Sequence, residues 1–173
     1  PPMFGHLDPP DPGYRWEGTE RVNIVLIGSD AGPGRTDELT DTIMVLTLDP
    51  ATRTAAMVSI PRDSGYLPLP DRSVYADGIF PFRINELASD ANADRAAWCP
   101  GLAPSEDCGL HIRRQAVGLY LGLVIHHVAW VDLLGFAALV DAIGGVDLCL
   151  PGILADPDYG GPTWEGREGV VLE

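Results

Sequence analysis

The sequence predicts an α/β protein in which helices flank a central, mixed β-sheet. Short runs of β-branched and apolar residues, each bounded by turn-forming residues, indicate buried strands at 22–27, 42–48 and 55–60. Further along the chain, segments of helical periodicity alternate with apolar runs, as they do in layered α/β folds. These two observations predict the fold class.

The first three strands are expected to gather polar side chains at one edge of the sheet. The first strand is a nearly unbroken apolar run that Gly28 stops, so we expect it to be buried on both faces. Residues 49–52 have turn chemistry, so the next two strands should form a hairpin beside it. This pairing brings Asp30, Asp41 and Arg62 to one rim, where open α/β sheets usually bind ligands. Arg35 lies in the glycine-rich loop between the two aspartates, which suits an anion.

The middle of the chain is predicted to hold an insertion and two helices. Residues 64–82 contain three prolines and at most one short strand. Residues 83–87 resemble the start of a helix that lies over the strand ends. A second helix, ending at about residue 121, should present a core-facing stripe and leave Arg113 and Arg114 on a solvated face; the stripe consists of Ile112, Ala116, Leu119 and Tyr120.

The last part of the chain is predicted to be a strand, a helix and a strand, at 126–131, 132–143 and 146–150. Adjacent histidines in a strand point to opposite faces, so His126 and His127 cannot ligate one metal, and a hydrogen-bonded structural histidine is favoured. Asp132 is the expected N-cap of the helix, whose apolar face should pack on the sheet, and two glycines at 144–145 should end it.

Composition limits the possible partners. The 173 residues fit one domain, which we place at 21–173 after an extended leader at 1–20. The formal net charge of −14 argues against nucleic acid or an anionic membrane surface as a partner. A phosphate ligand would therefore need local arginines or a metal cation.

The three cysteines indicate a disulfide and one thiol left over. Cys99 and Cys108 flank a loop rich in turn formers, which in an exported protein indicates a disulfide-clamped loop. The alternative, a metal site, lacks both the CxxC spacing and a neighbouring histidine pair. Cys149, at the end of the last predicted strand, is interpreted as a buried free thiol.

The chain resembles the LytR-CpsA-Psr family of extracytoplasmic enzymes that assemble bacterial cell envelopes. The resemblance covers roughly residues 21–151 and rests on GSDAGPGRTDELTDTIMVLTLDP, VSIPRD, RINEL and VDLLGFAALVDAIGGVDLCLP. It implies a phosphotransferase that moves a glycopolymer from a polyprenyl-pyrophosphate carrier onto a peptidoglycan hydroxyl, with Mg²⁺ or Mn²⁺ at the pyrophosphate. It also implies a membrane-anchored parent at the outer face of the bacterial membrane, anchored through a segment that this chain lacks.

The resemblance and the rim together define the candidate site. Arg62 and the two aspartates, Asp30 and Asp41, are the catalytic candidates, and the aspartates are also the metal candidates, close enough to share one ion. The pyrophosphate candidates are Arg35, Arg62, Arg83 and Asn85. Structural alternatives remain open: the aspartates as turn or cap residues, Arg62 paired with Asp63, and Arg83 covering apolar surface.

The chain departs from the family pattern at two points. Leu39 stands where the resemblance implies an arginine, a role that Arg35 would have to take over. The arginine-rich helical segment that the family carries after the last strand would lie beyond Glu173, so the domain is expected to be truncated at its C-terminal end; a partner for Cys149 would lie there too. The prenyl tail would need an apolar pocket, which the helix faces at 112–120 and 133–143 would provide if they are not ordinary core.

Three functions are compatible with these residues. The first is the glycopolymer phosphotransferase, and the second is hydrolysis of a polyprenyl pyrophosphate with water as the acceptor. The third is a module that binds prenyl-phosphate lipid or glycan without turnover, which Leu39 and the missing arginine segment favour.

Overall fold

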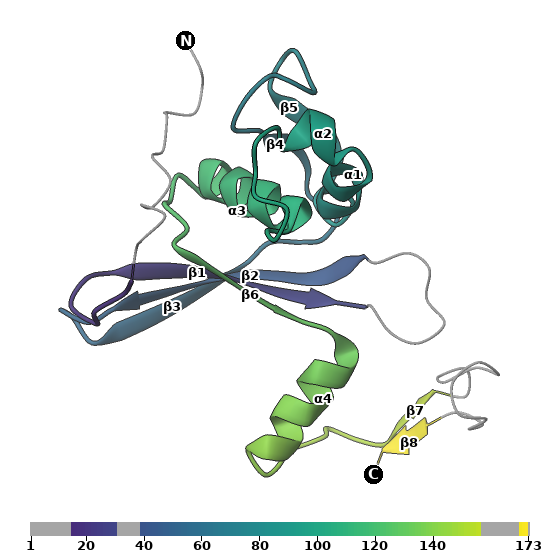
Figure 1. Ribbon diagram of the computed structural model, residues 1–173. Helices are drawn as coiled ribbons and strands as arrows, with labels where there is room; N and C mark the ends of the chain where they lie inside the picture. The colour runs from purple at the N-terminus through teal and green to yellow at the C-terminus, as the bar shows by residue number, and fades with distance from the viewer. Residues whose placement is uncertain (1–14, 31–38, 157–169, 173) are drawn as a thin grey trace.

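A four-stranded mixed sheet forms the centre of the protein in the computed structural model, which describes residues 15–30, 39–156 and 170–172 (Figure 1). Its strand order is β3-β2-β1-β6, with β1 at Val22–Ser29, β2 at Thr40–Asp49, β3 at Thr54–Ser59 and β6 at His127–Val131. β2 is antiparallel to both β1 and β3, whereas β6 runs parallel to β1. The predicted α/β class, the mixed sheet and the hairpin are confirmed.

One face of the sheet is the core face. Val25 of β1 pairs with Val45 of β2, and Ile27 pairs with Ile43, and all four side chains are almost completely buried. The helices α1 (Leu87–Ala93), α2 (Arg95–Trp98) and α3 (Cys108–Leu121) lie on this side of the sheet (Figure 1). Side chains from the sheet and from these helices therefore share one hydrophobic core.

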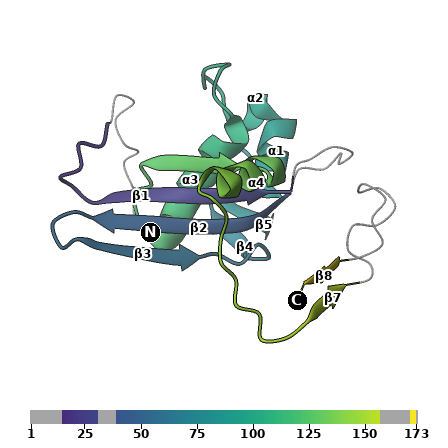
Figure 2. The ribbon, with the colours of Figure 1, turned by 90° about the horizontal axis from the view of Figure 1, so that it is seen from below.

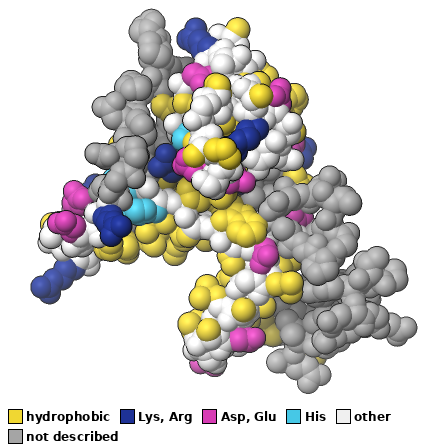
Figure 3. Space-filling view, viewed as in Figure 1, with side chains coloured by type: hydrophobic (Ala, Val, Ile, Leu, Met, Phe, Trp, Pro, Cys, Tyr) yellow, Lys and Arg dark blue, Asp and Glu magenta, His cyan; other side chains and the backbone are white. Residues whose placement is uncertain are grey.

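The opposite face of the sheet is much less covered, so the prediction that β1 is buried on both faces was wrong. Ile24 and Leu26 of β1 are half-buried, and every residue of β3 is exposed. The helix α4 (Leu133–Ala142) lies on this side of the sheet but has no buried residue. Four of its large apolar side chains and that of its C-cap residue are exposed: Leu133, Leu134, Phe136, Leu139 and Ile143. Figure 3 shows the resulting apolar surface on the underside of the sheet and along α4. The helix therefore forms as predicted but does not pack as predicted.

The ends of α4 follow the predicted capping chemistry. The side chain of Asp132 accepts a hydrogen bond from the N–H of Gly135 at 2.6 Å, so Asp132 is the N-cap. Gly144 and Gly145 both have positive φ and donate to carbonyls of the last turn, at Asp141 and Val140. Residues 146–150 are not a strand, because no described strand lies beside them to complete a ladder, and Cys149 is exposed rather than buried.

The insertion at 64–82 is more regular than predicted. It contains both strands of a hairpin, β4 at Gly65–Pro68 and β5 at Ile79–Arg83, where one strand at most was expected. Arg83 pairs with Gly65 at the end of β5, so α1 begins at Leu87 rather than at residue 83. Residues 84–86 form the turn between the hairpin and α1.

The inner face of α3 differs from the predicted stripe. Ile112 and Ala116 are buried as expected, but Tyr120 is 41% exposed. Arg113, predicted to be solvated, is 1% exposed and is among the largest fully buried side chains. The buried face is therefore rotated toward residues 109, 113 and 117, and the interior of the domain admits a guanidinium group.

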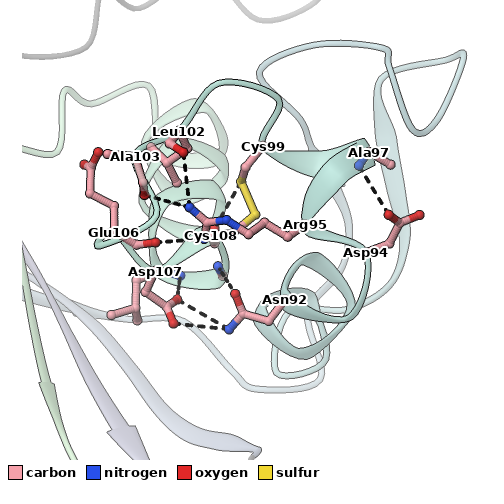
Figure 4. The surroundings of a disulfide bond; sticks show 12 residues. Asn92, Asp94, Arg95, Ala97, Cys99, Leu102, Ala103, Glu106, Asp107 and Cys108 are labelled. Atoms are coloured by element: carbon pink, nitrogen blue, oxygen red, sulfur yellow. Dashed lines mark hydrogen bonds between the residues drawn. A yellow bond between two sulfur atoms is a disulfide. The ribbon is translucent and has the colours of Figure 1, made fainter.

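A disulfide between Cys99 and Cys108 joins α2 to the start of α3, as predicted (Figure 4). The loop between the cysteines is also held by Arg95, whose guanidinium donates to the carbonyls of Leu102, Ala103 and Glu106. Asp107 caps α3 by accepting from the N–H of Leu110 at 2.7 Å. The start of α3 is thus fixed both covalently and by hydrogen bonds.

A buried polar network joins β1 to the segment before β6. Asn23 is 5% exposed; its side chain donates to the carbonyl of Val124 and accepts from the hydroxyl of Thr47. Its N–H donates to Nδ1 of His126 at 3.0 Å. His126 is therefore a hydrogen-bonded structural histidine, as the sequence indicated.

Within the described residues, every helix is too short or too polar to cross a membrane.

Candidate functional site: the strand-end rim

The ends of β1 and β2 and the exit from β3 meet at one edge of the sheet, which we call the rim and define as residues 29–30, 39–41 and 62–63. Ser29 pairs with Thr40, and the N–H of Asp30 donates to the carbonyl of Leu39 at 3.0 Å. The N–H of Ile60 donates to the carbonyl of Ile43 at 2.8 Å, which keeps the chain after β3 beside β2. Figure 2 shows these strand ends side by side. The structure therefore brings Asp30, Asp41 and Arg62 to one edge, whereas Arg35 lies outside the described residues.

Two ion pairs organise the charged side chains of the rim. Nη1 of Arg62 donates to Oδ1 of Asp41, across the hairpin. Arg83, at the end of β5, lies with its Nη1 3.6 Å from Oδ1 of Asp63. The alternative pairing of Arg62 with Asp63 is therefore not adopted. All four side chains are about half exposed or more, so each pair is worth only about 0–1 kcal/mol. A ligand phosphate can replace either carboxylate at little cost.

Asp30 has a structural role that the sequence allowed for. Its Oδ1 accepts a hydrogen bond from the N–H of Leu39 at 3.0 Å, beside the backbone bond between the same two residues. These two bonds close the neck of the loop that separates β1 from β2. The turn interpretation of Asp30 is thus correct, and its role as a metal ligand stays a prediction.

Asn85 lies in the turn that follows Arg83 and is 3% exposed. Its N–H reaches the carbonyl of Arg62 at 3.4 Å, and the N–H of Ile84 donates to the carbonyl of Ser64 at 2.8 Å. The turn is therefore attached to the rim through its backbone. Oδ1 of Asn85 and Oγ1 of Thr40 are buried without a hydrogen-bond partner among the described residues. Most buried oxygens in folded proteins are hydrogen-bonded, so these two set Thr40 and Asn85 apart from ordinary packed residues.

The donor set at the rim suits a hard cation. Asp41 and Asp63 are each paired with a guanidinium, those of Arg62 and Arg83, and the carboxylate of Asp30 lies at the same edge. No group of three or more His, Cys, Asp or Glu side chains that could hold a metal occurs in the described part of the chain. Two carboxylates with room for water and phosphate oxygens are nevertheless a usual arrangement for Mg²⁺. That Asp30 and Asp41 hold a metal shared with a ligand stays a prediction.

Arg113 is the residue beside the rim that sequence reasoning missed. Its Nη2 donates to the carbonyls of Ile84 and Asn85, at 3.4 and 3.3 Å. The signal was present in the helical periodicity, because Arg113 lies four residues after Gly109 and four before Val117, both buried. The prediction left Arg113 off the stripe through Ile112 and Ala116, but the buried face of the helix is wider than that stripe and includes it.

Comparison with known proteins settles the family. The LytR_cpsA_psr family matches residues 8–163, which is most of the chain. This chain belongs to the LytR-CpsA-Psr family. It is 31% identical over 175 residues to the cell wall biosynthesis protein LcpA of Corynebacterium glutamicum, with 85% of this chain and 32% of LcpA covered.

One further curated relative and one solved structure are also similar to this chain. The chain is 26% identical over 136 residues to TagU of Bacillus anthracis, a polyisoprenyl-teichoic acid–peptidoglycan teichoic acid transferase, with 79% of the chain and 37% of TagU covered. The crystal structure of Bacillus subtilis TagV matches with a TM-score of 0.56 at 22% identity, over 89% of this chain and 52% of TagV, which shows a shared fold. The chain spans about a third of the length of the curated relatives named here.

Proposed function

We propose that this chain carries the site of a phosphotransferase that moves an anionic glycopolymer from a polyprenyl-pyrophosphate carrier to peptidoglycan during cell-wall assembly. The reaction would take place at the outer face of a bacterial membrane, on a membrane-anchored parent. The observation that carries the proposal is the rim itself, where Arg62 and Arg83 lie beside carboxylates at one sheet edge in weak, exchangeable ion pairs. Family membership and the name of TagU supply the reaction class.

The chemistry requires attack by a peptidoglycan hydroxyl on the phosphorus that bears the sugar. The bond from that phosphorus to the bridging oxygen breaks, and polyprenyl phosphate leaves. Arg62 and Arg83 suit the phosphate oxygens, because each guanidinium can donate to two of them at once. A carboxylate of Asp30 or Asp41 would accept the proton of the attacking hydroxyl.

A cation would complete the site. Mg²⁺ or Mn²⁺ held by Asp30 and Asp41 would neutralise charge on the pyrophosphate oxygens when it is bound. Such a cation would offset the repulsion between the carboxylates of the rim and the negative charge of a pyrophosphate. Arg35 and Asn85 are proposed as further contacts to the pyrophosphate.

The isoprenoid chain needs an apolar surface next to the rim. The inner face of α3 is occupied by core packing at Ile112 and Ala116, so of the two helix faces considered from the sequence it is the less suitable. The face of α4 that carries Leu133, Phe136 and Ile143 is exposed, and it lies on the same side as the uncovered face of the sheet. We propose this region for the prenyl tail.

A second candidate function is binding without turnover, since Leu39 occupies a position for which the family resemblance implies an arginine. One experiment separates the candidates. The chain is incubated with a polyprenyl-pyrophosphate-linked glycan, Mg²⁺ and peptidoglycan, and both the released polyprenyl phosphate and the peptidoglycan-bound glycan are measured. Release with attachment supports the transferase, and release without attachment supports the hydrolase. Binding without release supports the binding module.

The arginines are tested by titrating geranylgeranyl pyrophosphate with and without Mg²⁺. Arg62→Ala should lose one charge-assisted contact of roughly 1.5–3 kcal/mol, which weakens affinity about ten- to hundredfold. Leu39→Arg should tighten binding, because it adds a guanidinium to the rim while keeping the backbone bonds to Asp30. Arg21→Ala is the matched control, because Arg21 forms an equivalent pair with Asp49 at the other end of the strands.

The outcome for the parent chain decides the proposal. Unchanged affinity in Arg62→Ala would place the anion site elsewhere. A parent chain that binds no pyrophosphate under either condition would contradict both the transferase and the binding module.

A further inference from the structure

Arg113 is a buried charge that the proposed reaction does not use directly. It lies on the inner face of α3, flanked by Ile112 and Ala116, and its side chain is 1% exposed. Removing a guanidinium from water is costly, and a hydrophobic side chain of similar size would fill the same space without that cost. The position therefore calls for a role beyond packing.

The contacts of Arg113 point to the turn that follows β5. Nη2 donates to two successive carbonyls, those of Ile84 and Asn85. On the other side of the same turn, the N–H groups of these two residues donate to the carbonyls of Ser64 and Arg62. The turn is thus held between the rim on one side and α3 on the other. Both contacts are made by one terminal nitrogen, Nη2, at the end of a side chain that is longer than that of lysine.

The side chain held by this turn is Asn85. It is 3% exposed, and its Oδ1 has no hydrogen-bond partner among the described residues. An amide kept buried with an unsatisfied oxygen reduces stability, so packing alone does not account for an asparagine here. The same turn directly follows Arg83 and is bonded to the backbone of Arg62. A shift of the turn would therefore move three of the proposed pyrophosphate contacts together.

We propose that Arg113 is a positioning residue of the pyrophosphate site, which fixes the turn at 84–86 and through it the placement of Asn85. The inference rests on the proposed function for its ligand, but the local effect on the turn is independent of any ligand. Arg113 also places a third guanidinium, after those of Arg62 and Arg83, beside the turn that is attached to the rim.

The test compares Arg113→Met with Arg113→Lys and with Arg114→Met as the matched control. Methionine keeps the apolar bulk of the arginine stem in the core and removes its charge and its hydrogen-bond donors. Arg114 is the next residue on the same helix, and its charge interacts with those of Glu106 and His111. Thermal unfolding of each variant establishes that the fold is retained.

The first readout is amide hydrogen exchange in the ligand-free chain. We expect the N–H groups of Ile84 and Asn85 to lose protection in Arg113→Met, to recover it partly in Arg113→Lys, and to keep it in Arg114→Met. Unchanged protection in Arg113→Met would overturn the proposal, whatever the ligand measurements show.

The second readout is a double-mutant cycle on the affinity for geranylgeranyl pyrophosphate in the presence of Mg²⁺. Arg113→Met and Asn85→Ala should each weaken binding by about tenfold. The double variant should have the same affinity as the single variant that binds less tightly, because one residue acts through the other. Losses that multiply would show that Arg113 does not act through Asn85. If the parent binds pyrophosphate and Arg113→Met binds it equally well, only this inference is contradicted. If the parent binds no pyrophosphate, the proposed function is contradicted.

Discussion

Arg62 shares its carboxylate partner with the proposed metal. Asp41 is about half exposed, pairs with Arg62 across the hairpin and is also one of two candidate ligands for Mg²⁺. A cation that takes Asp41 would leave Arg62 available to a phosphate. The same two residues would thus be paired in the free protein and separated by the ligand, at a cost of no more than about 1 kcal/mol for an exposed pair.

This exchange predicts an unusual result for Asp41→Asn. Without Mg²⁺, the variant should bind geranylgeranyl pyrophosphate up to about fivefold more tightly, because Arg62 no longer has a competing carboxylate. The increase in affinity that Mg²⁺ gives the parent should shrink, because one of its ligands is gone. Calorimetric titration with and without Mg²⁺ measures both effects.

Asp63→Asn is the matched control. It releases Arg83 in the same way but leaves both candidate metal ligands in place, so the effect of Mg²⁺ should persist. If Asp41→Asn keeps the full Mg²⁺ effect, Asp41 is not a metal ligand.

At the scale of secondary-structure elements, the start of α3 is held by both covalent and hydrogen bonds. The disulfide and the Asp107 cap fix its first turn, and the three carbonyl contacts of Arg95 hold the loop that leads into it (Figure 4). Arg113 lies five residues after Cys108, so this anchoring also sets the axial position of the guanidinium that reaches the turn at 84–86.

Loss of the disulfide should therefore lower the stability of the domain. A loop of this length between Cys99 and Cys108 corresponds to about 2–4 kcal/mol of stabilisation. Cys99→Ser combined with Cys108→Ser should lower the free energy of unfolding by that amount in a denaturant titration. Cys149→Ser is the control, since that thiol is exposed and unpaired in this chain, and it should have no effect. Equal stability of the double variant and the parent would show that the remaining contacts fix the loop without the disulfide.

At the scale of the whole molecule, the two faces of the sheet are in different environments. The face under α1 and α3 is a closed core, and the face toward α4 leaves Met57, Leu139 and Ile143 more than half exposed. The polar network of Asn23 and His126 joins β1 to the entry of β6 and so ties the sheet to the end of α3. A change in the charge of this network should affect global stability.

The pKa of His126 is lowered from its usual value of 6.5, chiefly by burial and further by His127, while the contact with Asn23 and the charge of Glu20 act in the opposite direction. The unfolded chain therefore binds a proton more readily than the folded one. The contribution of neutral His126 to the free energy of unfolding is fully present above pH 6.5. It is lost as the pH falls toward the lower pKa that His126 has in the folded chain. His111, whose pKa burial and Arg114 also lower, contributes in the same direction.

The melting temperature of the parent should therefore fall between pH 7 and pH 5, and that of His126→Asn should fall less. Scanning calorimetry across this range gives the slope of melting temperature against pH for the parent and for His126→Asn. His127→Asn serves as the control on the neighbouring position. Identical slopes for the parent and His126→Asn would show that protonation of His126 is not coupled to unfolding.

Several features of the site were predictable from the sequence because they are local or follow from strand order. The alternation of apolar runs placed the strands, and the hairpin at 49–52 then brought Asp41 and Arg62 beside Asp30. The spacing of Cys99 and Cys108 predicted their bond, and Asp132 and Gly144 marked the ends of α4. Each of these depends on residues that are close in sequence or on one pairing between neighbouring strands.

Only the tertiary structure decided which partners the charged residues take and which apolar surfaces are covered. Arg62 pairs with Asp41 rather than with its neighbour Asp63, because cross-strand pairing at the rim brings the more distant carboxylate within reach. Arg113 is buried because carbonyls of the turn at 84–85, far away in sequence, satisfy part of its guanidinium. The apolar pattern of α4 forms a helix without specifying what that helix packs against, because periodicity determines which face is apolar and only neighbouring elements in space can bury it.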